Sequence, residues 1–593
     1  MATGTDEAWW SQDGERGPAE KYRSHEVRSR YVELADGTRV AVDVYLPSGL
    51  PAAEQLTTFF CSTPYFRRFE FRSRLAEKLM ARAFTGGGAN WWPALARYGH
   101  AVVVVEQRGS GASFGQRSLD IASEVKDMAD VVDWVVDQPW SDGRVVPIGV
   151  SAMGLNSLYL LTSRHPAVAA SMPMFAAFDL YTATHPGGLM FDRSLENIGN
   201  AMRAMDSNRM TEMAPNRVLG LAMRLLVRGL HPVDDDDDRS QLAEAVRDHA
   251  GNAYIDVALL SVEQRDDPME ATAAGITIDA RSPATYADDM RAADVPLNGY
   301  IGWWDSGSTR EMLNLFAAVP TGGSRLVIGP WGHAGTKQIG PGHGKGAPSR
   351  FDFAADIARF LQQPAGDTRT IHYFTLREDR WKTTTSWPPA ALAVGYHLGD
   401  GGRLAPTPTQ LDGSDRLAVD ATVGTGPLSR WALEKHPANG VEYADRTAVD
   451  AKLLTYTTAP LPQHTEVTGH PRVRLFASSS DPDAVFIVYL EEVTADGSVF
   501  YVTEGELRAV HRMGASFTRA DIRPVTPGEV MDLAFDMQPI SYRFPAGSAL
   551  RVTIAGGDAD NFRPSTAKAP TIEVYWGPDH PSAVALPVVV SGT

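Results

Sequence analysis

The stretch Pro147-Ile148-Gly149-Val150-Ser151-Ala152-Met153-Gly154 decides how this chain is expected to fold. A short apolar run ends at Val150, and a helical pattern with Leu155 and Leu158 begins directly behind it. A serine at the apex of a sharp strand-to-helix turn has its Oγ lifted above the sheet, and the following backbone N–H groups point toward developing negative charge. The stretch therefore predicts Ser151 as an exposed nucleophile.

Strand-like and helical patterns alternate around this turn. The predicted elements are strands at 31–34, 40–46, 55–61 and 101–105 and a helix at 128–136. An Asp36-Gly37 turn between the first two runs predicts a hairpin. Strands that alternate with helices favour a parallel, doubly wound sheet. Together with the turn at Ser151, this pattern predicts the fold of the α/β-hydrolases.

The character of the chain changes twice beyond this region. Residues 166–290 show few strand signals and carry methionines at helix-compatible positions, which predicts an inserted helical cap. Strand patterns return at 297–303 and 325–329, and Pro364–Asp367 resembles a linker. Beyond it, short β-rich runs between Gly, Pro and Asp turns predict a β-sandwich or jelly roll. The expected organisation is an arm at 1–24, a hydrolase domain at 25–165 and 291–365, a cap at 166–290 and a C-terminal domain at 366–593.

Bulk composition narrows the function classes. The 593 residues exceed one core, so two or three domains are expected. A net charge of −17 argues against nucleic acid and anionic membranes as partners. The chain has a single cysteine, Cys61, and shows no signal peptide or membrane-spanning stretch, which favours a cytoplasmic protein. A homo-oligomer is possible on this composition. No metal-binding motif or dinucleotide fingerprint is visible, so no metal and no cofactor are expected.

A serine nucleophile needs a histidine base and an acid that orients it, and in α/β-hydrolases both follow the serine along the chain. Asp305 follows the apolar stretch 297–304, and His333 follows the run 326–332. Both therefore stand at the end of an expected strand, as Ser151 does. The rival base, His343, lies in a loop with no strand before it, and the rival acid, Asp179, precedes the insertion without a strand-end context.

These motifs resemble the cocaine esterase and X-Pro dipeptidyl-peptidase (CocE/NonD) family of serine hydrolases. The resemblance extends over about residues 25 to 590 and rests on the stretches 108–113, 138–143, 149–154, 179–181, 186–188, 302–305, 329–333, 381 and 386–389. It implies an α/β-hydrolase domain, a helical cap and a C-terminal jelly-roll (galactose-binding-like) domain. It also implies Ser151 as nucleophile, Asp305 as acid and His333 as base. Ala152 stands where relatives usually carry an aromatic residue.

The oxyanion hole is expected from two donors. Ala152 supplies a backbone N–H as well as any other residue does. By resemblance, Tyr65 in the loop after the third strand supplies its hydroxyl. Gly86-Gly87-Gly88 is similar to the glycine loop of lipases, but it lies beyond a helical stretch and is interpreted as a flexible loop.

In the family that the chain resembles, the stretch after the acid supplies either an aromatic residue that lines the acyl site or carboxylates that hold a substrate ammonium. Asp305-Ser306-Gly307-Ser308 has neither feature, so no amine-recognition cluster and a roomier acyl pocket beside Gly307 are expected. Trp303 and Trp304 flank the acid, one expected in the core and one in the pocket. The methionines of the expected cap are interpreted mainly as core packing, and the Asp234–Asp238 run as a solvated helix end or loop.

The sequence thus predicts a cofactor-free serine hydrolase that cleaves carboxylic esters of small molecules, with amides also open, through an acyl-enzyme. The alternatives are an acyltransferase with the same triad, an X-Pro or aminoacyl peptidase, and a non-catalytic binding protein. An ordered Ser, Asp and His set argues against the last of these.

Overall fold

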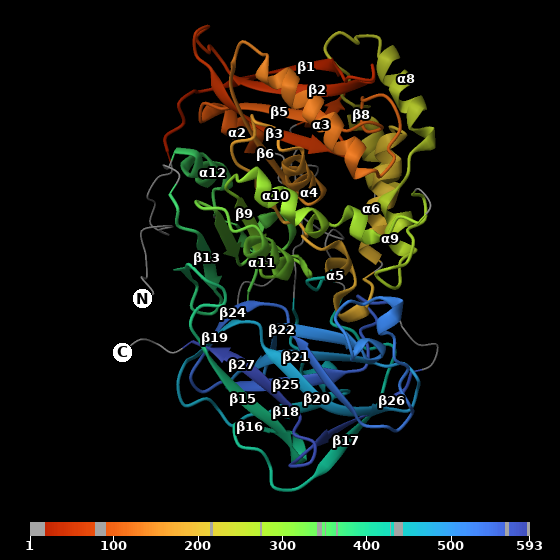
Figure 1. Cartoon of the computed structure of the whole chain (residues 1–593), viewed down its shortest axis with the longest axis vertical. Helices are drawn as coiled ribbons and strands as arrows, with labels where there is room; N and C mark the ends of the chain where they lie inside the picture. Colours follow the sequence, from red (N-terminus) through yellow and green to blue (C-terminus); the bar gives the residue numbers. More distant parts are fainter. Residues whose placement is uncertain are drawn as a thin grey trace.

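The structure is a computed structural model of the whole chain (Figure 1). It describes residues 18–77, 91–191, 193–213, 217–272, 275–340, 347–349, 351–362, 366–426, 428–431, 443–563 and 569–589. Most of the expected arm at 1–24 lies outside these residues. Two large sheets dominate the fold, one in the earlier part of the chain (red to green) and one in the later part (blue).

The first sheet has ten strands among the described residues, in the order β1-β2-β5-β3-β6-β7-β9-β10-β13-β14. The strands are β1 (His25–Glu33), β2 (Arg39–Pro47), β3 (Leu56–Thr63), β5 (Ala101–Glu106), β6 (Ser141–Val150), β7 (Met172–Met174), β9 (Asn298–Gly302), β10 (Arg325–Gly329), β13 (Thr370–Thr375) and β14 (Arg380–Thr384). Neighbours from β5 to β13 are parallel, whereas β1, β2 and β14 pair antiparallel at the edges. The carboxyl ends of the parallel strands therefore share one edge.

The local sequence explains these elements. β5 is buried at every position, as expected for a central strand covered on both faces. The predicted hairpin is confirmed: β1 pairs with β2 through a turn in which Gly37 has a φ of 84°. The predicted helix at 128–136 is longer, since α3 spans Ile121–Val136 and begins at Asp120, whose carboxylate accepts from the N–H of Ser123. The first turns of α3 carry mostly polar residues, so the apolar pattern did not indicate that the helix begins before residue 128.

Further helices flank the first sheet (Figure 1). They are α2 (Trp92–Arg97), α4 (Ala152–Tyr159), α10 (Ala287–Ala293), α11 (Ser308–Ala318) and α12 (Phe353–Gln362). α11 directly follows the loop after β9 and packs against β9 and β10. Residues 303–307 are therefore held between a central strand and a helix.

The stretch between β7 and β9 is mostly helical. It contains α5 (Leu180–Thr184), α6 (Arg193–Asp206), α7 (Arg217–Leu226), α8 (Ser240–Asp248) and α9 (Ile255–Leu260), and a short strand β8 (Val227–Leu230) that pairs with β4 (Phe69–Phe71). Four methionines of this stretch, at positions 202, 205, 210 and 223, share one buried apolar cluster, and Met190 belongs to another. They pack as core residues. β7 belongs to the first sheet, although it lies within the range expected for the cap.

The second sheet contains thirteen strands among the described residues. They are β15 (Leu392–Gly399), β16 (Arg403–Ala405), β17 (Gly413–Ala418), β18 (Leu454–Thr457), β19 (Thr465–Gly469), β20 (Arg472–Ser479), β21 (Val485–Val493), β22 (Val499–Arg508), β23 (Met531–Asp536), β24 (Ile540–Phe544), β25 (Ala549–Ala555), β26 (Thr571–Trp576) and β27 (Ala583–Val588). Nearly all neighbours are antiparallel; β16 and β18 are parallel at a single register pair. A short helix, α13 (Thr447–Asp450), precedes β18.

The two sheets are joined by backbone and by a shared core. β13 and β14 lie beyond residue 365 and still belong to the first sheet. The N–H of Leu376, just after β13, donates to the carbonyl of Ser541 at 3.0 Å, and the N–H of Arg543 donates back to the carbonyl of Leu376 at 3.0 Å. One continuous apolar cluster contains buried residues of both sheets. The later part of the chain is thus packed firmly onto the earlier part.

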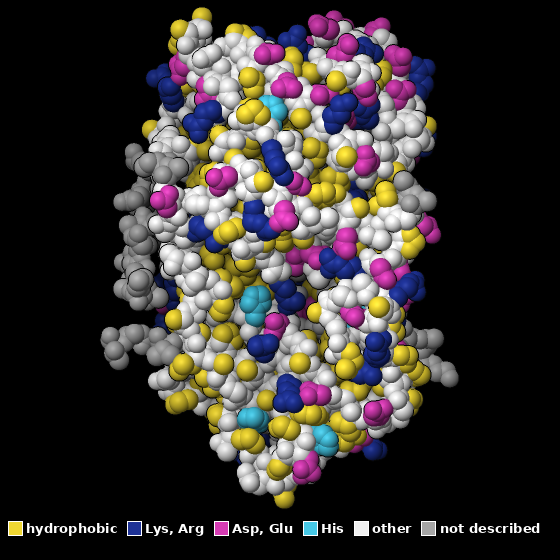
Figure 2. Space-filling model, in the orientation of Figure 1, with side chains coloured by type: hydrophobic (Ala, Val, Ile, Leu, Met, Phe, Trp, Pro, Cys, Tyr) yellow, Lys and Arg dark blue, Asp and Glu magenta, His cyan; other side chains and the backbone are white. Residues whose placement is uncertain are grey.

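Acidic and basic side chains are interspersed over the face seen in Figure 2, so the net charge of −17 is not gathered there in one acidic patch. In the described ranges, none of the helices combines the length and apolar character that a bilayer crossing requires.

Candidate active site

Ser151 stands at the apex of the turn between β6 and α4. Its backbone has φ 61° and ψ −124°, a conformation that a residue with a Cβ adopts only under strain. The turn is held because the Ser151 N–H donates to the carbonyl of Met174 on β7 at 2.9 Å, and its carbonyl accepts from Leu155 at 3.0 Å. The predicted strand-to-helix turn is confirmed.

Two glycines make this turn sterically accessible. A Cβ built on Gly149 would lie 2.3 Å from the Cβ of Met153, and one on Gly154 would lie 2.8 Å from the carbonyl oxygen of Met174. Normal contacts between carbon atoms are about 3.5–4.0 Å. Helix α4 therefore approaches the strands more closely than any larger side chain would permit.

Asp305 and His333 are brought together at the ends of neighbouring strands. β9 and β10 are parallel and place Gly302 beside Gly329, and the two loops that follow carry the two side chains. His333 Nδ1 lies 2.8 Å from Asp305 Oδ1, with the carboxylate fully buried and the imidazole 13% exposed. An Nδ1–H donated to the carboxylate directs the imidazole's function as a base to Nε2.

The loop after β3 carries Tyr65. β3 is the direct neighbour of β6, and the Asn156 side chain of α4 donates to the carbonyl of Ser62 at 2.9 Å, which ties the end of β3 to the helix that starts at Ala152. Tyr65 is partly buried, and its N–H donates to the hydroxyl of Thr63 at 3.2 Å. Tyr65 and Ala152 therefore belong to adjacent strand ends.

A buried ion network behind the Tyr65 loop was not foreseen from the sequence. The Arg67 guanidinium pairs with Asp43 on β2 and lies 3.1 Å from Glu106 Oε2 at the end of β5. The Arg67 N–H donates to Glu106 at 2.8 Å. Because these partners come from three separate segments, no local pattern signals the network. It fixes the loop two residues beyond Tyr65.

The rival acid has a structural role. Asp179 caps α5 by accepting from the N–H of Tyr181 at 2.9 Å, and it pairs with Arg265 at 2.7 Å. His343 and the Gly86–Gly88 stretch lie outside the described residues.

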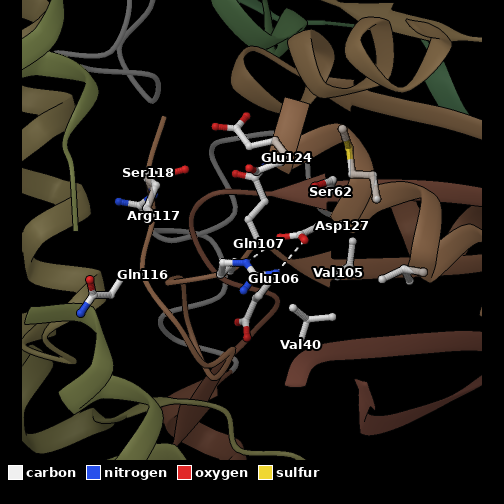
Figure 3. A pocket seen from close by; sticks show the side chains of 14 residues that line it. Val40, Ser62, Val105, Glu106, Gln107, Gln116, Arg117, Ser118, Glu124 and Asp127 are labelled. Atoms are coloured by element: carbon white, nitrogen blue, oxygen red, sulfur yellow. Dashed lines mark hydrogen bonds and ion pairs between the residues drawn. The ribbon is translucent and has the colours of Figure 1, made fainter. Parts of the chain in front are cut away.

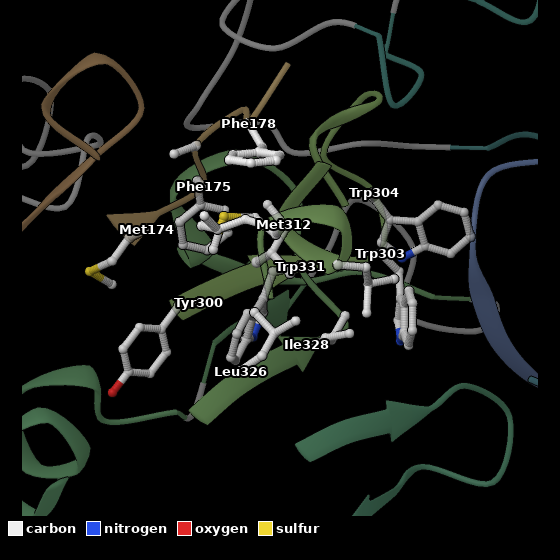
Figure 4. Packing of buried hydrophobic residues seen from close by; sticks show 14 of the residues in the cluster. Met174, Phe175, Phe178, Tyr300, Trp303, Trp304, Met312, Leu326, Ile328 and Trp331 are labelled. Carbon is white, nitrogen blue, oxygen red and sulfur yellow. The ribbon is translucent and has the colours of Figure 1, made fainter. Parts of the chain in front are cut away.

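The expected pocket residues are packed. Trp303 and Trp304 are 0% and 1% exposed, and their indole N–H groups donate to the carbonyls of Phe374 at 2.7 Å and Ile339 at 3.3 Å. Figure 4 shows both at the side of the apolar cluster nearest a strand of the later part of the chain (blue). These contacts do not favour the prediction that one of them faces the substrate.

The space beside Gly307 is occupied by α5. A Cβ built on Gly307 would lie 3.4 Å from Ala183 and from the carbonyl of Thr182. Glu311, one turn later on α11, bonds the same segment: it accepts from the N–H of Asp179 at 2.8 Å and from the Thr182 hydroxyl at 2.9 Å. Burial, together with the charge of Asp179, raises the pKa of Glu311 to about 7. A charged residue on the apolar side of α11, beside Met312 and Leu315, was the sequence signal for it.

The Asp234–Asp238 run forms the approach to α8. The Asp236 carboxylate accepts from the N–H groups of Gln241 at 3.0 Å and Leu242 at 2.9 Å, and Asp234 accepts from Ser29 at 2.8 Å. The run is a helix end as interpreted, with Asp236 buried and the other four aspartates exposed to solvent. Within the described ranges, no group of three or more His, Cys, Asp or Glu side chains is placed to hold a metal ion.

A cavity lies at the carboxyl ends of β3 and β5 (Figure 3). Ser62, Glu106, Gln107 and Arg117 are among the residues that line it, and the three predicted triad residues are not. Ser62 Oγ, Gln107 Nε2 and Arg117 Nε are buried with no hydrogen-bond partner among the described residues. Bound water would satisfy such atoms.

The fold and the strand-end Ser, Asp and His define a hydrolase with a second, C-terminal domain. Comparison with known proteins agrees: the family model of X-Pro dipeptidyl-peptidase (S15 family) matches residues 36–335, and that of the X-Pro dipeptidyl-peptidase C-terminal non-catalytic domain matches residues 361–583. The chain belongs to the X-Pro dipeptidyl-peptidase (S15) family, which confirms the family resemblance.

Individual relatives cover nearly the whole chain. A Mycobacterium bovis protein provisionally named a serine esterase is 36% identical over 638 aligned residues, covering 99% of each chain. Cocaine esterase of Rhodococcus sp. is 25% identical, covering 94% of this chain and 97% of its own. The solved structure of an α-amino acid ester hydrolase superposes with a TM-score of 0.66 at 18% identity, covering 98% and 99% of the two chains. That likeness shows the hydrolase fold.

Proposed function

We propose that this protein is a serine esterase that cleaves carboxylic esters of small molecules through an acyl-enzyme. The observation that carries the proposal is the Asp305–His333 hydrogen bond at 2.8 Å on the sheet edge where Ser151 stands in its strained turn. The names of two relatives, a serine esterase and cocaine esterase, support the same bond class.

Each residue has one role in the proposed mechanism. His333 Nε2 removes the Ser151 proton as Oγ attacks the ester carbonyl, and Asp305 orients and stabilises the imidazolium. The Ala152 N–H and the Tyr65 hydroxyl donate to the oxyanion of the tetrahedral intermediate. His333 returns the proton to the leaving alcohol, and a water then repeats the sequence on the acyl-enzyme. No step requires a metal or a cofactor.

The fold supports an assignment of the chain to separate domains. We propose that the helical stretch between β7 and β9 is a cap over the hydrolase domain, and that the second sheet is a jelly roll. The hydrolase domain would then include β7, β13 and β14, which belong to the first sheet. The single cysteine, Cys61, is buried and permits no intrachain disulfide, which supports a cytoplasmic enzyme.

The test is Ser151→Ala, assayed on p-nitrophenyl esters and by fluorophosphonate labelling. We expect turnover to fall by about 10⁶-fold and labelling to disappear, with the circular dichroism spectrum unchanged. Ser240→Ala, at an exposed serine at the start of α8, is the matched control and should behave as wild type. Retained turnover or labelling in Ser151→Ala would refute the nucleophile assignment.

The family description favours one second candidate, X-Pro peptide cleavage. Against it, residues 305–308 offer no carboxylate beyond Asp305 for a substrate amine. Esters and X-Pro anilides of matched acyl size, assayed with and without an added alcohol or amine, separate hydrolysis of esters, peptide cleavage and acyl transfer. We expect ester hydrolysis to dominate.

A further inference from the structure

A residue from the later part of the chain forms hydrogen bonds on both sides of Asp305. Arg430, in the described segment 428–431, is 1% exposed. Its Nη2 donates to the carbonyl of Trp303, and its own carbonyl accepts from the N–H of Ser306 at 3.1 Å. Both bonds hold backbone, one on each side of Asp305.

The Asp305 carboxylate has little else to orient it. Oδ1 bonds His333, and Oδ2 is buried without a hydrogen-bond partner among the described residues. The orientation of the side chain is therefore set through its backbone. Ser306 has a φ of 46°, and such a conformation in a residue with a Cβ persists only where neighbouring structure enforces it. The bond to the Arg430 carbonyl acts at that residue.

Arg430 is itself held in place. Its guanidinium lies 5.8 Å from the centre of the Trp304 ring and 6.0 Å from that of Tyr501, and its N–H donates to the Tyr443 hydroxyl at 3.0 Å. Its Nε and Nη1 are buried without hydrogen-bond partners among the described residues. The buried carboxyl groups of Glu504 and Glu506 also interact electrostatically with the guanidinium, whereas its side-chain hydrogen bond among the described residues goes to the Trp303 carbonyl.

We propose that Arg430 is a positioning residue that aligns Asp305 with His333 by clamping the backbone at Trp303 and Ser306. The C-terminal domain, which contributes no reacting group, would thereby help to orient the triad acid. This inference rests on the proposed role of Asp305 as the triad acid.

The clamp has a kinetic signature. Loss of the guanidinium bond to the Trp303 carbonyl, with the backbone bond between Ser306 and residue 430 still available, lets the Asp305 loop shift, and the imidazolium of His333 then loses part of its partner's charge. A nearby carboxylate raises the pKa of an imidazole, so its displacement lowers that pKa. The base must be neutral to act, so the acid limb of kcat/KM moves to lower pH while the plateau falls. A purely structural loss would lower the folded fraction without moving this limb.

The experiment uses the full-length protein with Arg430→Met, Arg430→Lys and, as control, Arg377→Met. Arg377 forms another contact between the two parts of the chain, an ion pair with Glu492 at 2.6 Å. We expect Arg430→Met to lower kcat by about 10²-fold, the usual cost of about 1 Å of misplacement, and to move the acid limb. Arg430→Lys keeps the charge and should show a smaller shift with a smaller loss. The Arg377→Met profile should superpose on wild type once corrected for the folded fraction by circular dichroism.

Asp305→Asn completes the test. We expect it to cost about 10⁴-fold in kcat, and Arg430→Met added to it should cost nothing more, because its effect passes through the carboxylate. An unmoved acid limb in both Arg430 variants, or an equal loss in the Asp305→Asn background, would overturn the inference while the proposed triad stands. Wild-type activity of Asp305→Asn would overturn the triad itself, and the clamp with it.

Discussion

Replacement of Gly149 by alanine tests whether the close approach of α4 to β6 positions the nucleophile. The added Cβ would meet Met153 at three atoms, the Cβ at 2.3 Å, the carbonyl carbon at 2.6 Å and the carbonyl oxygen at 2.7 Å. Two of these are backbone atoms, so no rotamer change relieves the overlap. The first turn of α4 must move by about 1 Å to reach ordinary contact distances.

That displacement has two measurable costs. Overpacking of this kind typically destabilises by about 1–3 kcal/mol, and a misplacement of about 1 Å at a reacting group costs about 10²-fold in rate. We expect Gly149→Ala to lower the thermal midpoint and to lower kcat/KM for a p-nitrophenyl ester by about that factor. Gly557→Ala is the control, because nothing lies within 4 Å of its added Cβ and its φ is not positive. Wild-type kcat/KM in Gly149→Ala would refute the steric account of the turn.

Two further predictions concern residues beside the proposed triad. Tyr65→Phe removes one oxyanion donor and should lower kcat by about 10²–10³-fold with KM nearly unchanged, as measured by steady-state kinetics; an unchanged kcat would exclude the hydroxyl as a donor. Burial raises the pKa of Glu311 from 4.5 to about 7, so the folded state binds this proton more tightly than the unfolded chain and wild-type stability falls as pH rises from about 4.5 through 7, by about 3 kcal/mol. Glu311→Gln stays neutral and should lose that fall, measured as urea midpoints at pH 5 and pH 8. Parallel pH dependence in the two proteins would contradict it.

Much of the candidate site could be predicted because its signals are local. The elbow is a contiguous stretch in which Gly149, Ser151 and Gly154 follow a buried strand. Asp305 and His333 each follow an apolar run by a few residues, and a parallel sheet brings such positions to one edge. The packing of Trp303 and Trp304 was less accessible, because the side toward which an indole turns depends on neighbours far along the chain.

The sequence by itself determined the strand-to-helix turn at Ser151, the order of the three candidate catalytic residues and the family. Only the tertiary structure decided that Asp305 meets His333 across 28 positions, that Glu311 is buried against α5, and that Arg430 reaches Trp303 across 127 positions. The physical reason is that turns and strands depend on neighbouring residues, whereas a buried polar group takes whichever partner the packed chain brings to it. The orientation of the Asp305 carboxylate, which the proposed chemistry requires, depends on such distant partners.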